Sequence, residues 1–240
     1  MDEVRDPAAS VSDDLAWVSQ AVEMWIARFE PRLVAVDAPC GRGAKPSGKS
    51  ARTCEQAAVR DVNELWARGR LDSSVAAVTF GIAPTPHRDR PQPYGWMHTG
   101  FAVYGALASS GYERADSLDT LSATDRVAVE VYPDATFWLL GSVGGWGSAV
   151  ERGAPVARKR HARKAQVVAD RLAVLPDALR VALAPSTAFP PTPSRQPDFV
   201  DAVAGALTGE MALRHRARSF DGLAGEGSLW LPEVTVGAGR

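Results

Sequence analysis

The stretch that decides the fold is Leu33-Val-Ala-Val-Asp37-Ala-Pro39. An apolar run carries one carboxylate, Asp37, to its carboxyl end, and a Gly-rich basic segment follows. Consecutive apolar side chains predict a strand buried on both faces, as in the middle of an α/β sheet. A charge in such a strand is costly unless it ends in a cleft or meets a cation. Asp37 is therefore a candidate site residue.

Helices and strands alternate along the chain. The pattern of the first helix predicts a start near Ser12 and a broad apolar face that packs on something large. Apolar side chains recur there at every fourth position: Trp17, Ala21, Trp25 and Phe29. The alternation predicts an α/β fold with mainly parallel pairing. A length of 240 residues allows one large domain or two small ones, and the family resemblance described below implies a single domain over residues 1–240. Further helices are expected over residues 51–68, 96–109, 155–175 and 198–214, and extended segments over residues 75–82, 127–132 and 229–231.

The composition excludes several classes of protein. A net charge of −1 gives no overall attraction to nucleic acid or to an anionic membrane, so such binding would need a local patch. Two cysteines, Cys40 and Cys54, make neither a disulfide framework nor a four-ligand zinc site. No apolar run approaches the ~20 residues of a membrane span, and no signal peptide opens the chain. We therefore expect a cytoplasmic protein without a membrane partner.

Gly43-Ala-Lys-Pro-Ser-Gly48-Lys49-Ser50 matches the phosphate-binding P-loop pattern in full. A strand precedes it and a helix follows, as a P-loop requires. However, the strand ends several residues before Gly43, and Pro46 cannot donate an amide to a phosphate. A P-loop nucleotide hydrolase and a plain surface loop are both open on these residues.

Several short motifs recur in a fixed order, and together they resemble the family called domain of unknown function 429. The resemblance covers residues from about 10 to 232 and makes the P-loop match accidental. It implies a ribonuclease-H-like fold, which is a mixed sheet flanked by helices. The motifs are Val-Asp37-Ala-Pro39, then Gly48 with Arg52-x-Cys54-Glu55-x-x-x-x-Arg60, then Glu130-Val-Tyr132-Pro133, and finally Asp198-x-x-Asp201-Ala.

The resemblance also implies a site. Ribonuclease-H-like proteins gather carboxylates at one edge of the sheet to bind two Mg²⁺ or Mn²⁺ ions, which activate water against a phosphodiester. It makes Asp37, Glu130, Asp198 and Asp201 the expected metal ligands and catalytic residues of a metal-dependent nuclease or phosphodiesterase. A non-catalytic module of the same fold, binding nucleic acid or protein, is the alternative. From the residues alone, Glu130 could face solvent or an arginine, and Asp198 with Asp201 could cap the last helix.

Basic and aromatic residues supply candidates for substrate contact. Arg52 and Arg60 match family positions and could meet a phosphate or pair with the acidic residues. Residues 158–164 hold the densest basic cluster, in which Lys159 and Arg163 are the candidates for phosphate; a solvated helix face is the alternative. Trp96 and Trp146, in Gly/Pro-rich surroundings, are the tryptophans expected to make contacts rather than to fill the core.

The chain departs from the family pattern at its beginning. Members of the family usually open with a strand hairpin whose first strand ends in aspartate, and here the hairpin is incomplete or missing. The absent strand would neighbour Leu33–Asp37, so this strand is expected to present an unpaired edge. We therefore expect self-association, or a partner protein, at that edge.

Overall fold

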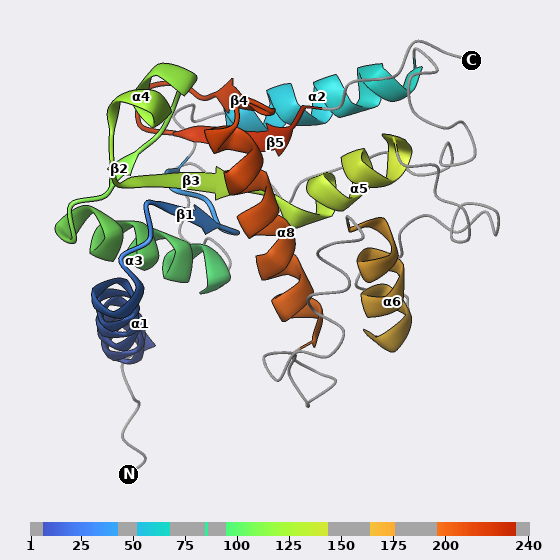
Figure 1. Cartoon of the computed structure of the whole chain (residues 1–240). Coiled ribbons are helices and arrows are strands. Elements are labelled where there is room, and N and C mark those ends of the chain that lie inside the picture. The colour runs from blue at the N-terminus through green and yellow to red at the C-terminus, as the bar shows by residue number, and fades with distance from the viewer. Residues whose placement is uncertain are drawn as a thin grey trace.

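The computed structural model describes residues 7–42, 52–67, 85, 95–143, 164–175 and 196–233. These residues form a mixed sheet with helices packed on both faces (Figure 1). The predicted α/β class, with a mixed sheet flanked by helices, is confirmed. The segment expected to be extended over residues 75–82 lies outside the described residues.

Five strands make the sheet, in the order β1-β3-β5-β4, with β2 also paired to β3. The pairs of β3 with β1, β2 and β5 are parallel, whereas β4 and β5 are antiparallel. The parallel pairing agrees with the sequence pattern, while β4 was not predicted. The strands are β1 (Leu33–Val36), β2 (Glu113–Arg114), β3 (Val127–Val131), β4 (Ala217–Asp221) and β5 (Ser228–Pro232).

The helices divide between the two faces because neighbouring strand residues point to opposite sides. Leu33, Ala35 and Val129 pack with residues of α8, whereas Val34, Val36 and Ala128 pack with α1 and α3. The helix α2 covers β4 and β5. The helices are α1 (Pro7–Phe29), α2 (Thr53–Ala67), α3 (Gly95–Ser109), α4 (Leu118–Ala123), α5 (Pro133–Val143), α6 (Lys164–Val174) and α8 (Gln196–Leu213).

Close packing of α8 on the sheet depends on glycine. A methyl group at Gly209 would lie less than 3.0 Å from the side chain of Leu33, and one at Gly205 would lie 3.2 Å from Val131. The two glycines are four residues apart, so they lie on the same side of the helix. The helix therefore approaches β1 and β3 closely, and this places its N-terminal turns beside the carboxyl end of the sheet.

Two helix starts differ from the sequence predictions. The helix α1 begins at Pro7, so Ser12 lies inside it and is not its cap. The helix α5 was not predicted, because a proline directly after an extended segment commonly ends a strand. Proline suits the first position of a helix, where its missing N–H costs nothing, and Pro133 begins α5 immediately after β3. The residues before 164 in the predicted helix 155–175 lie outside the described residues.

The strand β1 lies at one end of the sheet rather than in its middle. Each of its four residues is only half-buried, whereas all five residues of β3 are buried. The prediction of burial on both faces was therefore wrong for β1. The expectation of an edge strand is confirmed for the described part of the chain, in which β1 pairs with β3 alone. Self-association through that edge stays a prediction.

The apolar face of α1 is only partly buried. Ile26 is buried and Val22 packs beside it against the sheet and α3. The expectation that the whole face packs on the molecule was wrong, because several of its largest side chains are exposed: Trp17 (69%), Met24 (67%), Trp25 (46%) and Phe29 (56%).

Candidate functional site: an acidic pocket at the carboxyl ends of β1 and β3

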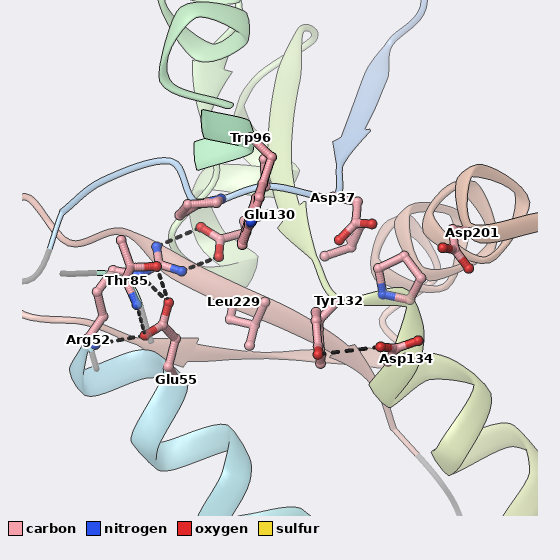
Figure 2. Close-up of a pocket in the computed structure, with 14 residues that line it drawn as sticks. Asp37, Arg52, Glu55, Thr85, Trp96, Glu130, Tyr132, Asp134, Asp201 and Leu229 are labelled. Carbon is pink, nitrogen blue, oxygen red and sulfur yellow. Dashed lines mark hydrogen bonds and ion pairs between the residues drawn. The ribbon is translucent and has the colours of Figure 1, made fainter. Parts of the chain in front are cut away.

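A pocket of about 340 Å³ opens where β1 and β3 end. The N-terminal turns of α2, α3, α5 and α8 surround it, since each of these helices contributes a lining residue from its start (Figure 2). Ligands of parallel α/β sheets commonly bind outside the carboxyl ends of the strands. The polar lining residues are Asp37, Arg52, Glu55, Thr85, Glu130, Tyr132, Asp134 and Asp201, with Trp96 as the largest aromatic.

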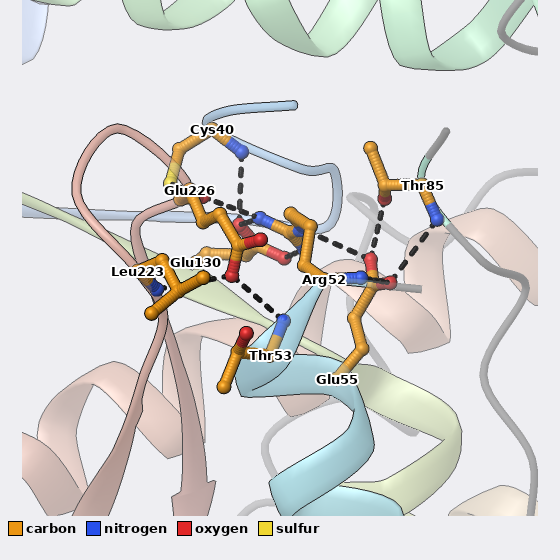
Figure 3. Close-up of polar contacts among 8 residues, drawn as sticks. All are labelled: Cys40, Arg52, Thr53, Glu55, Thr85, Glu130, Leu223 and Glu226. Atoms are coloured by element: carbon orange, nitrogen blue, oxygen red, sulfur yellow. Dashed lines mark hydrogen bonds and ion pairs between the residues drawn. The ribbon is translucent and has the colours of Figure 1, made fainter. Parts of the chain in front are cut away.

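One wall of the pocket is built around Arg52, whose side chain is 1% exposed. Its Nη1 donates to Oε2 of Glu130 at 2.7 Å, and its Nη2 donates to Oε1 of the same carboxylate. Its Nε donates to Oε1 of Glu55 at 2.9 Å. The Nη1 group also donates to the backbone carbonyl of Glu226 at 3.0 Å. Figure 3 shows the guanidinium enclosed by these acceptors, so Arg52 serves to neutralise a buried acidic cluster.

Two of these carboxylates also complete the N-terminus of α2. Glu55 accepts from the backbone N–H of Arg52 at 2.9 Å, which is the capping-box contact of a helix. Glu226, in the turn between β4 and β5, accepts from the backbone N–H of Thr53 at 2.7 Å and of Leu223 at 3.0 Å. A carboxylate near the N-terminus of a helix also interacts favourably with the positive end of the helix dipole. Residues far apart in the sequence are thereby held together at one point.

Burial and the charges of this cluster shift the pKa values of its side chains and of the neighbouring cysteines. Burial opposes the charge of Arg52, but Glu130 and Glu55 outweigh burial, so the pKa of Arg52 lies above its ordinary value. Burial raises the pKa of the Cys54 thiol from 9.0 to about 12. Burial, together with the charge of Glu130, also raises the pKa of Cys40. Both cysteines are free thiols, and neither is a nucleophilic thiolate at neutral pH.

The opposite wall depends on a second buried arginine, Arg171 of α6, which is 1% exposed. It forms ion pairs with Asp134 in the first turn of α5 and with Asp201 of α8. Its guanidinium also stacks over the ring of Phe137, 4.9 Å from the centroid. This contact joins three helices and fixes the two carboxylates that they bring to the pocket.

Asp37, Tyr132 and Trp96 lie between and above these walls. Asp37 is exposed just after β1, and Figure 2 shows it between Glu130 and Asp201. Burial raises the pKa of the Tyr132 hydroxyl, and the negative charges of Asp134 and Asp37 raise it further. Tyr132 therefore stays protonated at neutral pH. Trp96, 47% exposed in the first turn of α3, forms the rim.

The pocket is strongly acidic. Five carboxylates line it against one guanidinium, that of Arg52. Arg171 pairs with two of these five carboxylates, Asp134 and Asp201. When Arg171 is counted as well, the carboxylates of the pocket still outnumber the guanidinium groups by three among the described residues. Such a surface attracts cations and opposes an unaccompanied phosphate.

The structure brings three of the four predicted acidic residues to this pocket. Asp37, Glu130 and Asp201 line it, although they belong to three different elements. Asp198 does not line it; this residue is exposed in the first turn of α8. The helix begins at Gln196, so Asp198 lies within it and is not its N-cap.

Of the basic residues predicted to contact substrate, Arg52 lines the pocket. Arg52 pairs with the acidic cluster, which is one of the two roles expected for it, and its contact with a phosphate stays a prediction. Arg60 is exposed on α2 and does not line the pocket. Lys159 and Arg163, Trp146 and the P-loop match of residues 43–50 lie outside the described residues.

Sequence reasoning missed four charged residues of the site. Glu55 had a signal, because a glutamate three residues after the cap is typical of a helix start. Asp134 also had one, since an acidic residue after Pro133 suits the first turn of a helix. The sequence gives no local signal for Arg171 or Glu226, because their partners are distant in the sequence.

The residues of this pocket do not form a ready-made cage for a metal ion. Within the described ranges, no three His, Cys, Asp or Glu side chains are placed to hold one ion together. Both oxygens of Glu130 accept from Arg52, and Asp201 pairs with Arg171. The expected two-ion site therefore does not fit this arrangement. A Mg²⁺ ion that keeps its water and uses one or two carboxylates with a substrate phosphate needs no such cage.

Comparison with known proteins places the chain in a family. Residues 4–223 match the model of the family described as Protein of unknown function (DUF429), so the chain belongs to that family. No curated protein and no solved structure matches it. In the described part of the chain, no helix has both the length and the apolarity to cross a bilayer.

Proposed function

We propose that the acidic pocket binds a phosphoester together with a divalent cation, Mg²⁺ or Mn²⁺, and that the protein is a metal-dependent phosphodiesterase acting on nucleic acid. The observation that carries the proposal is the convergence of Asp37, Glu130 and Asp201 on one pocket at the carboxyl edge of the sheet. Acidic pockets need a cation before they accept a phosphate. When bound, such a cation neutralises phosphate charge and activates water.

The residues in and around the pocket have different roles in this proposal. Asp37, exposed at the end of β1, is the carboxylate that would hold the cation, with substrate oxygens and water as the remaining ligands. Arg52 and Arg171 hold Glu130 and Asp201 in place, so that the walls keep their shape. Trp96 offers an exposed ring at the rim, on which an unpaired base could stack.

Calorimetry with Mn²⁺ and a single-stranded oligonucleotide tests the proposal. We expect Mn²⁺ to bind more tightly when the oligonucleotide is present, and the oligonucleotide to be cleaved only with the metal. Asp37→Asn should weaken this binding at least about tenfold, since it removes a charged ligand. Asp119→Asn is the matched control, because Asp119 is an exposed residue in the first turn of α4 and does not line the pocket. Equal Mn²⁺ affinity with and without the oligonucleotide, or an inert Asp37→Asn, would contradict the proposal.

The second candidate is a non-catalytic module that binds nucleic acid or protein. The pairing of Glu130 and Asp201 with arginines favours it, because these carboxylates are already neutralised. Oligonucleotide binding without cleavage in the same experiment would identify this function.

The geometry of α2 counts against a P-loop hydrolase. The helix begins at Thr53, three residues after Ser50. The backbone N–H groups of Arg52 and Thr53 donate to the carboxylates of Glu55 and Glu226. A phosphate at this helix start would therefore meet two negative charges. Nucleotide affinity lost in Lys49→Ala would restore that hypothesis.

A further inference from the structure

The helix α1 has two apolar stripes, of which the molecule buries one. Val22 and Ile26 pack against the rest of the chain, as described above. The second stripe holds Trp17, Met24 and Trp25, with exposed fractions of 69%, 67% and 46%. Side chains of this size rarely gather on the surface of a monomeric protein unless the surface binds something.

The two tryptophans of this stripe are placed symmetrically about Ala21, which is itself exposed. Tryptophans lie four residues before and after it, at Trp17 and Trp25. Opposite charges lie seven residues before and after it, at Asp14 and Arg28. Spacings of four and seven residues return to nearly the same side of a helix. A small residue therefore lies at the centre, with aromatic groups beside it and complementary charges at the ends.

We propose that α1 is the interface of a homodimer, in which it packs antiparallel to α1 of a second copy with Ala21 at the two-fold axis. A two-fold axis at Ala21 places Trp17 of each copy against Trp25 of the other. It also places Asp14 of each copy opposite Arg28 of the other, where a parallel arrangement would oppose like charges. A self-complementary patch of this kind is what an isologous interface requires.

The structure explains why a second copy fits this surface. The small side chain of Ala21 lets the two backbones approach at the axis, while the flanking rings cover the junction. Aromatic pairs contribute about 0.5–1.5 kcal/mol beyond the area that they bury. The dimer leaves the acidic pocket open, because no residue of α1 lines it. The interface is thus independent of the function proposed for the pocket.

Light scattering after size-exclusion chromatography over a range of micromolar concentrations measures the oligomeric state. We expect a dimer for the full chain, with Trp25→Glu raising its dissociation constant at least about tenfold. Asp14→Arg and Arg28→Asp should each weaken the dimer about two- to fivefold, and their combination should restore it. A monomer at every concentration, or a combined variant weaker than both single variants, would overturn the proposal.

Oxidative cross-linking fixes the position of the axis. Ala21→Cys should give a disulfide-linked dimer, because the two copies of residue 21 face each other. Gln20→Cys, an exposed position beside the stripe, is the matched control and should cross-link poorly. The unmodified chain, with its own two cysteines, measures the background. Efficient cross-linking at residue 20 but not at residue 21 would reject the antiparallel arrangement, even if Trp25→Glu had dissociated the protein.

Discussion

Replacement of Arg52 with methionine removes the guanidinium that pairs with Glu130 while keeping much of the volume of the side chain. Glu130 and Glu55, 4% and 2% exposed, would then remain buried without their cation. Breaking a buried ion pair from one side costs about 3–5 kcal/mol. Because small domains have about 5–15 kcal/mol of stability, Arg52→Met should lose a large part of it.

Urea unfolding at pH 7 measures this loss. The matched control is Arg60→Met on the same helix, which should stay within about 0.5 kcal/mol of the natural protein because Arg60 is exposed. Adding Glu130→Gln to Arg52→Met should recover at least about 1 kcal/mol, since a neutral amide needs no counter-charge. An Arg52→Met protein as stable as Arg60→Met, or no recovery in the combined variant, would refute the reasoning.

Three further predictions concern stability. The free energy of unfolding of the natural protein should fall above pH 9, because the pKa of Cys54 is 9.0 in the unfolded chain and about 12 in the folded protein. Cys54→Ala should reduce the slope of this free energy against pH by up to about 1.4 kcal/mol per pH unit, measured by urea unfolding. Gly41→Ala should destabilise by about 1–3 kcal/mol, since a methyl group there lies less than 3.0 Å from the carbonyl oxygen of Gly225, whereas Gly105→Ala, with nothing within 4 Å, should be neutral or stabilising in thermal unfolding. Arg171→Met should lower the melting temperature as Arg52→Met does, and an unchanged temperature would show that the second wall is not held by Arg171.

Parallel pairing made part of the site predictable. The strand patterns around Asp37 and Glu130 indicated two parallel strands, and the carboxyl ends of such strands meet at one edge of a sheet. Asp201 followed from the family resemblance rather than from its own pattern, since its position fits helix capping equally well. The pattern of β1 was misleading, because its apolar sequence predicts burial on both faces although the strand is half-buried at the edge of the sheet.

Long-range ion pairs were beyond the reach of sequence reasoning. Arg52 meets a carboxylate 78 residues away and a backbone carbonyl 174 residues away. Nothing in the local pattern of Glu226, which lies in a turn, indicates that it caps α2. Arg171 reads as an ordinary polar residue of an amphipathic helix, because only the fold brings Asp134 and Asp201 to its guanidinium.

The central claim concerns a cation that acidic groups from separate elements attract to one pocket. Its most direct test is an anomalous difference map from crystals grown with Mn²⁺ and a short single-stranded oligonucleotide. The account predicts a peak within coordination distance of the carboxylate of Asp37 and of a substrate phosphate. A pocket that holds no Mn²⁺ while the oligonucleotide is bound, or a Mn²⁺ bound only elsewhere on the protein, would contradict it.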